Sequence, residues 1–257
     1  MASLAGRVAV VTGASRGIGA AIARRLAKDG LKVALVARTR DAIDGLAREL
    51  GGVAIEADVT AKGASEAIVA EVRSKLGEID VLVPNAGIEA SHKLESTTDE
   101  VWDALLAVNV TAVFRLCRAA IPAMAARDYG RVIVIASTAS LQGYAYTSAY
   151  CASKHAVLGL VRGIAAELAR TPVTINAVCP GFVDTSMVER SAQRIHQTTG
   201  REVEAAKQVL AKMWPQPRLL GVEEVAPLVA SLLPDEARGI HGQALTIDGG
   251  ATAIGGQ

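Results

Sequence analysis

Aromatic residues are scarce in this sequence: phenylalanine, tryptophan and tyrosine together make up 3% of its 257 residues. Hydrophobic residues nevertheless reach 51% of the chain, so the core must be built from alanine, valine, leucine and isoleucine. That aliphatic content is enough to cover both faces of a buried sheet. The length suits one large α/β domain spanning residues 1–257.

Cysteines are few and long apolar runs are missing. The three cysteines, Cys117, Cys151 and Cys179, are far apart, and their odd number cannot close completely into disulfides. No CxxC pair occurs and the four histidines are scattered, which argues against a metal site and favours a reducing cytosol. We also see no signal-peptide pattern and no run of about 18 apolar residues, so we expect a cytoplasmic protein with no membrane partner.

Neither sign of charge dominates the chain. Lysine and arginine number 27 against 26 aspartates and glutamates, and the basic residues are spread along the sequence. A basic patch or tail is the usual electrostatic footprint of nucleic-acid binding. The composition therefore gives no reason to expect nucleic acid as a partner.

Short apolar runs alternate with longer amphipathic stretches. The expected strands cover residues 7–12, 32–37, 53–57, 79–83, 131–136, 173–178 and 244–247, and the expected helices cover 18–29, 42–50, 64–76, 99–127, 148–170 and 222–233. Most strands are continuously apolar, which is typical of a parallel sheet with helices on both faces. The alternation predicts a single doubly wound, Rossmann-type α/β domain with a seven-stranded parallel sheet.

One segment, residues 182–217, interrupts this alternation. It is polar and charged, has one helical stretch around 203–213, and ends in Pro215 and Pro217. It is either a surface excursion or a lid over a site at the carboxyl ends of the strands. Because long excursions inside compact domains are commonly functional, we favour a substrate lid.

A glycine-rich loop, TGASRGIG over residues 12–19, follows the first strand and leads into a helix. Glycines permit a tight turn and let backbone N–H groups approach a pyrophosphate, which then lies at the positive end of the helix. Such a loop is often only a turn, but its place between a strand and a helix indicates dinucleotide binding.

The end of the second strand indicates which dinucleotide is bound. An NAD site typically has a carboxylate there to bind the ribose 2′-hydroxyl, whereas this chain reads Val36-Ala37-Arg38-Thr39-Arg40. Arg38 and Arg16 would instead bind a 2′-phosphate through charged hydrogen bonds, unless they are merely solvated. We therefore expect NADP(H) in preference to NAD(H).

Tyr150 stands four residues before Lys154 in a helical pattern, which places both side chains on one face. A free phenol has a pKa near 10 and is a poor proton shuttle at neutral pH. A cation about 4 Å away favours the phenolate by roughly 4 kcal/mol at an effective dielectric near 20. The spacing therefore predicts a phenol that titrates close to working pH and acts as an acid/base. Tyr144 and Tyr146 lack such a lysine and are expected to line the pocket or pack.

Two further polar residues are candidates on weaker signals. Ser137 follows an expected strand and could donate to a substrate carbonyl, although a lone serine there is more often a cap. Asn109 lies within a long apolar helix, where an amide is costly to bury without a partner. Taken alone, Asn109 is more often a satisfied structural amide.

Together these residues resemble the short-chain dehydrogenase/reductase family over nearly the whole chain. The matching motifs are residues 12–19, Asn85-Ala86-Gly87, Asn109, Ser137, Tyr150-x-x-x-Lys154, Pro180-Gly181 with Thr185, and Asp248-Gly249-Gly250. The resemblance implies that Asn109, Ser137, Tyr150 and Lys154 are catalytic: Tyr150 protonates the carbonyl oxygen, Ser137 orients it, Lys154 lowers the phenol pKa and binds the nicotinamide ribose, and Asn109 holds a water that relays protons. It also implies cofactor contacts from Gly13, Ser15, Arg16, Gly17, Ile18, Gly19, Arg38, Thr39, Asp58, Val59, Asn85, Ala86, Gly87, Tyr150, Lys154, Pro180, Gly181, Val183 and Thr185.

Within the family the sequence is most similar to bacterial 3-oxoacyl and aromatic-polyketide ketoreductases, and its lid resembles that of hydroxybutyrate dehydrogenases. Pro84 replaces the first asparagine of the usual Asn-Asn-Ala-Gly turn. Ala139 stands where hydroxybutyrate dehydrogenases have a substrate-binding histidine, which disfavours free hydroxybutyrate. Residues 88–91 also lack the Pro-Gly-Gly run associated with polyketide stereocontrol.

We therefore expect an NADPH-dependent carbonyl reductase acting on an acyl thioester or a bulky or aromatic ketone. Alternatives are an alcohol or 3-hydroxyacyl dehydrogenase working oxidatively and, remotely, a catalytically silent NADP-binding regulator; a sugar-nucleotide epimerase would need a larger carboxyl-terminal domain. The candidate substrate residues are Glu89, Gln142, Tyr144, Phe182, Met187, Met213 and Trp214. The resemblance implies a homotetramer formed through the helices at 99–127 and 148–170 and the strand at 244–247.

Overall fold

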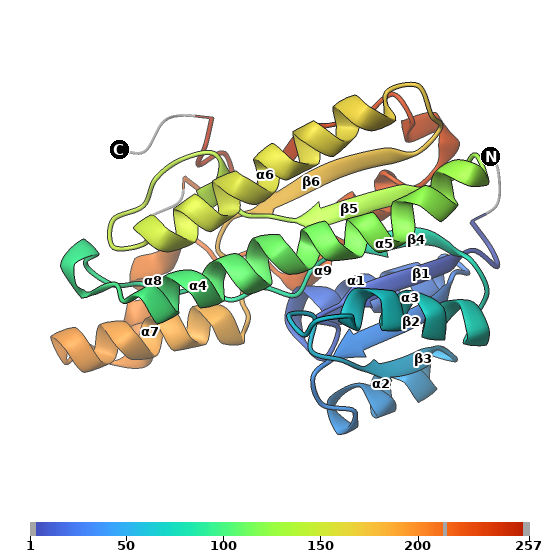
Figure 1. Ribbon diagram of the computed structural model, residues 1–257. Helices are drawn as coiled ribbons and strands as arrows, with labels where there is room; N and C mark the ends of the chain where they lie inside the picture. Colours follow the sequence, from blue (N-terminus) through green and yellow to red (C-terminus); the bar gives the residue numbers. More distant parts are fainter. Residues whose placement is uncertain (1–3, 213–214, 254–257) are drawn as a thin grey trace.

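A parallel sheet of seven strands forms the centre of the computed structural model, which describes residues 4–212 and 215–253 (Figure 1). The strands are β1 (Val8–Thr12), β2 (Lys32–Ala37), β3 (Val53–Glu56), β4 (Ile79–Val83), β5 (Arg131–Ile135), β6 (Thr174–Pro180) and β7 (Ala244–Ile247). Their order is β3-β2-β1-β4-β5-β6-β7. The winding direction reverses between β1 and β4, where such sheets bind ligands beyond the carboxyl ends of the strands. The predicted Rossmann-type sheet is confirmed.

Helices cover both faces of this sheet because its strands are apolar on both sides. Alternate residues of each central strand face opposite hydrophobic clusters, so that Val10 belongs to one cluster and Val11 to the other. One face packs against α1 (Gly17–Lys28), α2 (Asp41–Leu50) and α9 (Val222–Ser231). The other face packs against α3 (Ala64–Lys75), α5 (Ala112–Ala126) and α6 (Ser148–Leu168). The burial of aliphatic side chains on both faces is the main stabilising contribution.

The helix expected at 99–127 consists of three consecutive parts. These are α4 (Asp99–Leu106), a π-helical segment (Ala107–Thr111) and α5. By length and composition Asp99–Ala126 is the one helix among the described residues that could cross a membrane. It includes Arg115 and Arg118 and packs against α3, α6 and β4, as a helix covering a sheet does. A π-helical turn inserts one extra residue into a helix, and the apolar patterns before and after the insertion both remain helical. The apolar periodicity of the sequence therefore did not predict this segment.

The excursion at 182–217 contains two helices, not the single stretch expected at 203–213. They are α7 (Ser186–Thr199) and α8 (Val203–Lys212), which pack against each other (Figure 1). Helix α7 was not predicted because it is largely polar, and only Val188 and Ala192 of it are buried. Gly200 ends α7 in the left-handed conformation, with φ of 72°.

Strand β6 also extends two residues beyond the predicted end at 178. Proline lacks the N–H of a regular sheet residue. Pairing nevertheless continues, because Pro180 lies opposite Ile247 and the Gly181 N–H donates to the Ile247 carbonyl at 2.9 Å. The extension carries the residues after β6 further toward the expected cofactor site.

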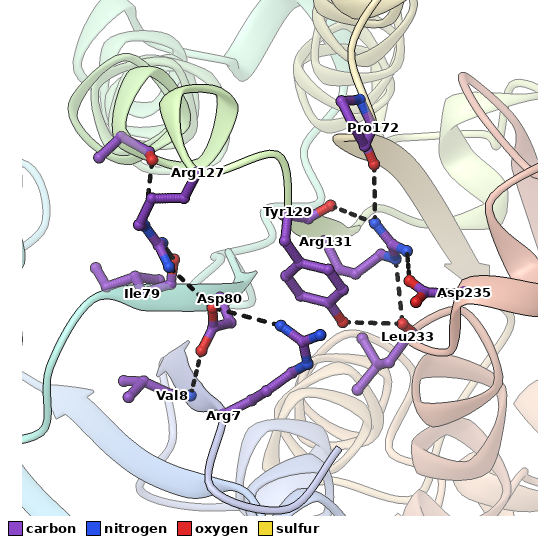
Figure 2. A network of polar contacts seen from close by, with 12 residues as sticks. Arg7, Val8, Ile79, Asp80, Arg127, Tyr129, Arg131, Pro172, Leu233 and Asp235 are labelled. Atoms are coloured by element: carbon purple, nitrogen blue, oxygen red, sulfur yellow. Dashed lines mark hydrogen bonds and ion pairs between the residues drawn. The ribbon is translucent and has the colours of Figure 1, made fainter. Parts of the chain in front are cut away.

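A buried arginine forms hydrogen bonds at the amino-terminal end of the sheet, where the strands begin (Figure 2). Arg131, the first residue of β5, is 1% exposed. Its guanidinium donates to the carbonyls of Leu233 (3.1 Å), Gly130 (2.9 Å) and Pro172 (3.0 Å) and to Asp235 (2.8 Å). It therefore links β5 to the segments that precede β6 and follow α9.

Tyr129 completes this arrangement on the other side of Arg131. Its hydroxyl donates to the Leu233 carbonyl at 3.1 Å, and its ring lies between the guanidinium groups of Arg131 and Arg7, whose Cζ atoms are 4.5 Å and 3.3 Å from the ring centroid. Asp80 pairs with Arg7 and accepts a hydrogen bond from the Val8 N–H at 2.9 Å. Cation–π contacts and charged hydrogen bonds thus tie the starts of β1, β4 and β5 together.

Candidate active site

Three elements bring the predicted catalytic residues to the carboxyl ends of the central strands, and the turn after β4 lies beside them. Ser137 follows β5, Tyr150 and Lys154 lie in the first two turns of α6, and Asn109 lies in the π-helical segment. The turn Asn85–Gly87 follows β4. These residues belong to one region at the winding reversal of the sheet.

Tyr150 is a neutral phenol in this environment. Burial raises the pKa of Tyr150 to about 12, and a hydrogen bond with Ser137 lowers it by less. The expectation of a phenol that titrates near neutral pH is therefore wrong for the chain without a cofactor. The Lys154 ammonium is 5.9 Å from the ring centroid of Tyr150. Desolvation by burial is the largest cause of the raised phenol pKa, followed by the hydrogen bond with Ser137, which lowers it.

Lys154 is buried and held in a fixed position. Its ammonium donates to the Ile135 carbonyl at 3.1 Å, and burial lowers the pKa of the amine to about 8. Gly87 packs close by: a Cβ atom there would lie 3.7 Å from Nζ of Lys154 and 3.3 Å from Oδ1 of Asn109. The absence of a side chain at Gly87 leaves space between the lysine and the turn after β4.

Asn109 joins three parts of the site through its amide. Its Oδ1 accepts from the Ile88 N–H at 3.0 Å, and its Nδ2 donates to the Ile88 carbonyl at 2.9 Å and to Oγ of Ser153 at 3.0 Å. Both N–H groups of the side-chain amide therefore donate hydrogen bonds within the protein. This is what a structural role for Asn109 requires. A water relay to Lys154 would have to use the second lone pair of Oδ1 or a backbone carbonyl.

The glycine-rich loop and the turn after β4 form one unit. Thr12 Oγ1 accepts from the N–H groups of Asn85 and Ala86 at 3.0 and 3.1 Å, and Nδ2 of Asn85 donates to the Thr12 and Gly13 carbonyls. A Cβ atom on Gly13 would lie 2.9 Å from Cα of Ala86, so only glycine fits at this close approach. This packing fixes the loop that the sequence predicts to bind a pyrophosphate.

Helix α1 begins without a side-chain cap, with Arg16 at its N-cap position. Its first N–H groups are thus suited to bind an anion. Ser15, Arg16 and Gly17 line a hollow of about 700 Å³ that continues past Thr185 to α9. A Cβ atom on Gly17 would lie 3.2 Å from the Thr185 methyl, so the loops after β1 and β6 meet there.

The end of β2 carries the residues expected to discriminate between the two dinucleotides. Arg40 is turned toward Asp44 at 3.4 Å, whereas no ion pair holds Arg38 or Arg16 in the described part of the chain. Asp58 accepts hydrogen bonds from the Thr60 hydroxyl and N–H, which lower the pKa of its carboxyl most, and Arg38 lowers it further. Arg38 and Asp58 therefore lie near each other at the expected adenosine end.

The residues after β6 approach the same region. Val183 is buried and pairs with Leu220 in an isolated bridge, and Thr185 Oγ1 donates to the Val183 carbonyl at 3.2 Å. Pro180 and Gly181 extend β6 along β7. Together they place the predicted nicotinamide-binding residues in a fixed loop at the base of α7.

The predicted substrate residues belong to separate groups of contacts. Gln142 donates to the Tyr144 hydroxyl, which donates to Oγ1 of Thr138, both at 2.8 Å. Phe182 lines a narrow crevice with Gln216 and Arg218. Met213 and Trp214 lie outside the described residues.

Glu89 and Met187 belong to the lid side of the site. Glu89 accepts from Ser191 Oγ at 3.1 Å and pairs with Arg194, and the Met187 carbonyl accepts from the same Ser191 hydroxyl at 3.2 Å. Ser191 and Arg194 were not among the predicted site residues. Their spacing of three residues would have indicated a shared face only if α7 had been recognised.

Known proteins match this combination of sheet and site. The family model described as short chain dehydrogenase matches residues 7–196. The chain belongs to the short-chain dehydrogenase/reductase family. It is accordingly an oxidoreductase that acts on CH–OH and C=O groups.

Relatives of this short-chain dehydrogenase carry different names. A D-beta-hydroxybutyrate dehydrogenase of Rhizobium meliloti is 37% identical over 96% of this chain and 99% of its own length. A putative ketoacyl reductase of Streptomyces coelicolor is 40% identical over 97% of this chain and 98% of its own. The crystal structure of an actinorhodin polyketide ketoreductase variant with NADPH superposes with a TM-score of 0.93 at 37% identity, covering 98% of this chain and 99% of that one.

The site of this short-chain dehydrogenase fits a nicotinamide dinucleotide. The observations are the uncapped start of α1, the glycine at position 13 that a Cβ would obstruct, and the adjoining hollow. Backbone N–H groups of residues 15–19 would hold the pyrophosphate, and Lys154 would bind the ribose beside Tyr150. When bound, the dinucleotide supplies or accepts the hydride.

Removing the buried charge of Lys154 should stabilise the cofactor-free protein. The pKa of this lysine falls from 10.5 to about 8, and a difference of this size corresponds to roughly 3 kcal/mol. Losing the hydrogen bond to Ile135 offsets about 1 kcal/mol. We therefore expect Lys154→Met to be inactive but about 2 kcal/mol more stable than wild type at pH 7.

The pH dependence of this difference has a definite sign. Below pH 8 the lysine is protonated in the folded and the unfolded chain, so the penalty is fully present. Between pH 8 and 10.5 the unfolded chain binds more protons, so wild type gains stability and the advantage of the variant disappears. Urea unfolding at pH 7 and pH 10 measures this, with the exposed Lys62→Met as control. A variant that is less stable than wild type at pH 7 would contradict the assigned penalty.

Proposed function

We propose that the protein reduces ketones to secondary alcohols with NADPH, reversibly, and that its substrate is an acyl thioester or a bulky or aromatic ketone. The observation that carries the proposal is the neutral Tyr150 phenol, hydrogen-bonded to Ser137 and one helical turn from a buried lysine. Such a phenol keeps its proton at pH 7 and can donate it to a carbonyl oxygen.

Each residue has a distinct part in this reaction. Tyr150 transfers its proton to the oxygen as the carbonyl carbon is reduced, and Ser137 donates a hydrogen bond that orients this oxygen. Lys154, protonated at pH 7, stabilises the phenolate that remains and attracts the next proton. Asn109 positions the turn after β4 against α6 so that the lysine keeps its place. These roles need no metal ion.

The preference for NADPH rests on the charges at the end of β2. No carboxylate stands there, and the guanidinium groups of Arg38 and Arg16 are available to a 2′-phosphate. A guanidinium forms two parallel hydrogen bonds with a phosphate group. The NADPH in the structure of the similar polyketide ketoreductase supports the same preference.

Steady-state rates would test the reaction itself. Purified protein is assayed for oxidation of NADPH and of NADH with ketones ranging from acetoacetyl thioesters to aryl diketones. We expect faster oxidation of NADPH, and the ketone class with the highest kcat/KM names the substrate type. Activity only with alcohols would favour the oxidative alternative. The similarity to a D-beta-hydroxybutyrate dehydrogenase also supports that alternative. Cofactor binding without turnover in either direction would favour the silent regulator.

Arg38→Asp should change the cofactor preference. The variant replaces a partner of the 2′-phosphate with a repelling charge, and a hydrogen bond to a charged group contributes about 1.5–3 kcal/mol. We expect the ratio of kcat/KM for NADPH to that for NADH to fall roughly 10- to 100-fold. Arg40→Asp is the matched control because Arg40 is turned toward Asp44. An unchanged ratio in Arg38→Asp would place the discrimination elsewhere.

Exposed apolar side chains and the open edge of the sheet support a homotetramer. We propose that the protein is cytosolic. Trp102 and Phe114 are each 42% exposed on the long helix formed by α4 and α5. The sheet order ends at β7, so the outer edge of that strand is open to a second copy. The three cysteines are free and buried.

We further propose that residues 1–257 form one catalytic domain with α7 and α8 as its substrate lid. Helix α7 contacts the segment after β4 through Ser191 and Arg194, which bind Glu89. Lys207 of α8 pairs with Glu189 of α7, so the two helices are joined to each other. Motion of α7 would therefore carry α8 with it.

A further inference from the structure

Ser153 stands directly before Lys154 in α6 and is completely buried, with 0% of its surface exposed. Its Oγ accepts a hydrogen bond from Nδ2 of Asn109 at 3.0 Å and donates one to the Tyr150 carbonyl at 2.8 Å. A hydroxyl has a single proton and a carbonyl can only accept, so that proton belongs to the bond with Tyr150. Asn109, Ser153 and Tyr150 therefore form a directed chain of hydrogen bonds from the π-helical segment to the backbone of α6.

Two other buried serines show that this arrangement is particular to Ser153. The hydroxyl groups of Ser65 and Ser140 are also buried, and neither has a hydrogen-bond partner among the described residues. A buried serine in this fold can thus remain unpaired, whereas Ser153 uses its hydroxyl both as a donor and as an acceptor. Both of its partners belong to the predicted catalytic set.

The Tyr150 carbonyl joins the backbone of the proposed acid to that of the lysine. In a regular α-helix this oxygen accepts from the N–H of Lys154, four positions later. The Ser153 hydroxyl is a second donor to the same oxygen, in a pattern that serine side chains form within helices. Ser153 thereby attaches the turn that carries Tyr150 and Lys154 to Asn109.

The amide of Asn109 depends on Ser153 for the partner of one of its N–H groups. The other N–H and Oδ1 pair with the carbonyl and the N–H of Ile88, at 2.9 and 3.0 Å. Oδ1 also borders the space at Gly87, where a Cβ atom would lie 3.3 Å from this oxygen and 3.7 Å from Nζ of Lys154. Without the Ser153 oxygen, one N–H of a buried amide would have no partner, which favours rotation of the amide away from Ile88. Ser153 therefore keeps an acceptor, Oδ1, next to the space that Lys154 borders.

Building on the proposed carbonyl reduction, we propose that Ser153 is a positioning residue for that reaction. It holds the Asn109 amide in the orientation that presents Oδ1 to the space beside Lys154, and it does so from the turn that carries Tyr150. Because Ser153 is completely buried, it acts through Asn109 and not on the substrate. Loss of its hydroxyl should therefore slow the chemical step and leave the binding of NADPH and ketone largely unchanged.

Kinetics of Ser153→Ala separate positioning from binding. Single-turnover rates and KM values are measured with NADPH and the ketone that the wild type reduces fastest, in a panel from acetoacetyl thioesters to aryl diketones. We expect the rate to fall about 10-fold, as for the loss of one hydrogen bond, while KM for NADPH and for the ketone stays within about 2-fold. Ser153→Cys keeps a weaker donor and acceptor in place, so its rate should lie between those of wild type and Ser153→Ala. Ser140→Ala removes a buried hydroxyl that has no partner and should keep the wild-type rate.

A double-mutant cycle tests whether Ser153 acts through Asn109. Ser153→Ala should slow the reaction about 10-fold in the wild type but less than about 2-fold in Asn109→Ala, where the amide is already missing. An equal loss in both backgrounds would overturn the inference, because Ser153 would then act on α6 by itself. A Ser153→Ala variant that unfolds at lower urea concentration but keeps the wild-type rate would also overturn it, and the proposed function would stand in both cases. A wild type that reduces none of the ketones would overturn the proposed function and the inference with it.

Discussion

Tyr150→Phe is expected to bind NADPH almost as tightly as the wild type and to turn over about 10²- to 10⁴-fold more slowly, the usual contribution of a general acid. The substitution removes one oxygen, which carries the proton to be transferred. The hydrogen bond with Ser137 is lost with it. The aromatic ring remains beside Lys154, so the shape of the site changes little. Single-turnover rates and NADPH fluorescence titration measure the two quantities separately.

Tyr146→Phe is the matched control for this experiment. Tyr146 lies four residues earlier, and 62% of it is exposed to solvent. Loss of its hydroxyl should leave turnover unchanged. If Tyr150→Phe kept wild-type turnover, another group would have to protonate the oxygen, and the assigned role would be refuted.

The pKa of Tyr150 marks the limit of what the sequence could predict for the site. The spacing of Tyr150 and Lys154 predicts that the two share a helix face, and they do lie in the first two turns of α6. The spacing gives no information on desolvation, because burial depends on parts of the chain that are remote in sequence. The phenol pKa was therefore predicted to fall, whereas burial raises it to about 12.

The fold was predictable wherever apolar periodicity was strong. The seven strands are apolar runs with no competing interpretation, and each was found within a few residues of its predicted bounds. Helix α7 was missed because a helix held at the surface by Glu89 and Arg194 needs few apolar residues of its own. The ion pair between Arg194 and Glu89 joins residues 105 positions apart, which a local sequence pattern cannot reveal.

Replacing Arg131 should produce the largest loss of stability. Arg131→Met keeps an unbranched side chain of similar length but leaves the carbonyls of Leu233, Gly130 and Pro172 without this donor. Each buried acceptor that loses its partner costs about 1–3 kcal/mol, and breaking a buried charged network costs about 3–5 kcal/mol in total. We expect the free energy of unfolding to fall by about 3–5 kcal/mol. Asp235 is half-exposed and stays solvated, so it adds little to the loss.

A graded series makes this prediction independent of whether the most severe variant folds. Arg131→Lys retains the charge but cannot reach all four acceptors, so it should lose an intermediate amount. Tyr129→Phe removes only the hydroxyl bond to Leu233 and should cost about 1 kcal/mol. Urea unfolding at a fixed protein concentration gives all three values, since assembly would shift the apparent stability.

The network should affect stability without affecting chemistry. Arg131 lies at the start of β5, whereas Ser137 follows the end of the same strand. The cofactor and substrate sites of such sheets lie at the carboxyl ends, so the two regions are separated by the length of the strand. Folded Arg131→Lys should therefore keep the kcat of the wild type while it unfolds at lower urea concentration. A reduced kcat of the fully folded variant would mean that the start of β5 positions Ser137. The amino-terminal ends of the strands would then contribute to catalysis as well as to stability.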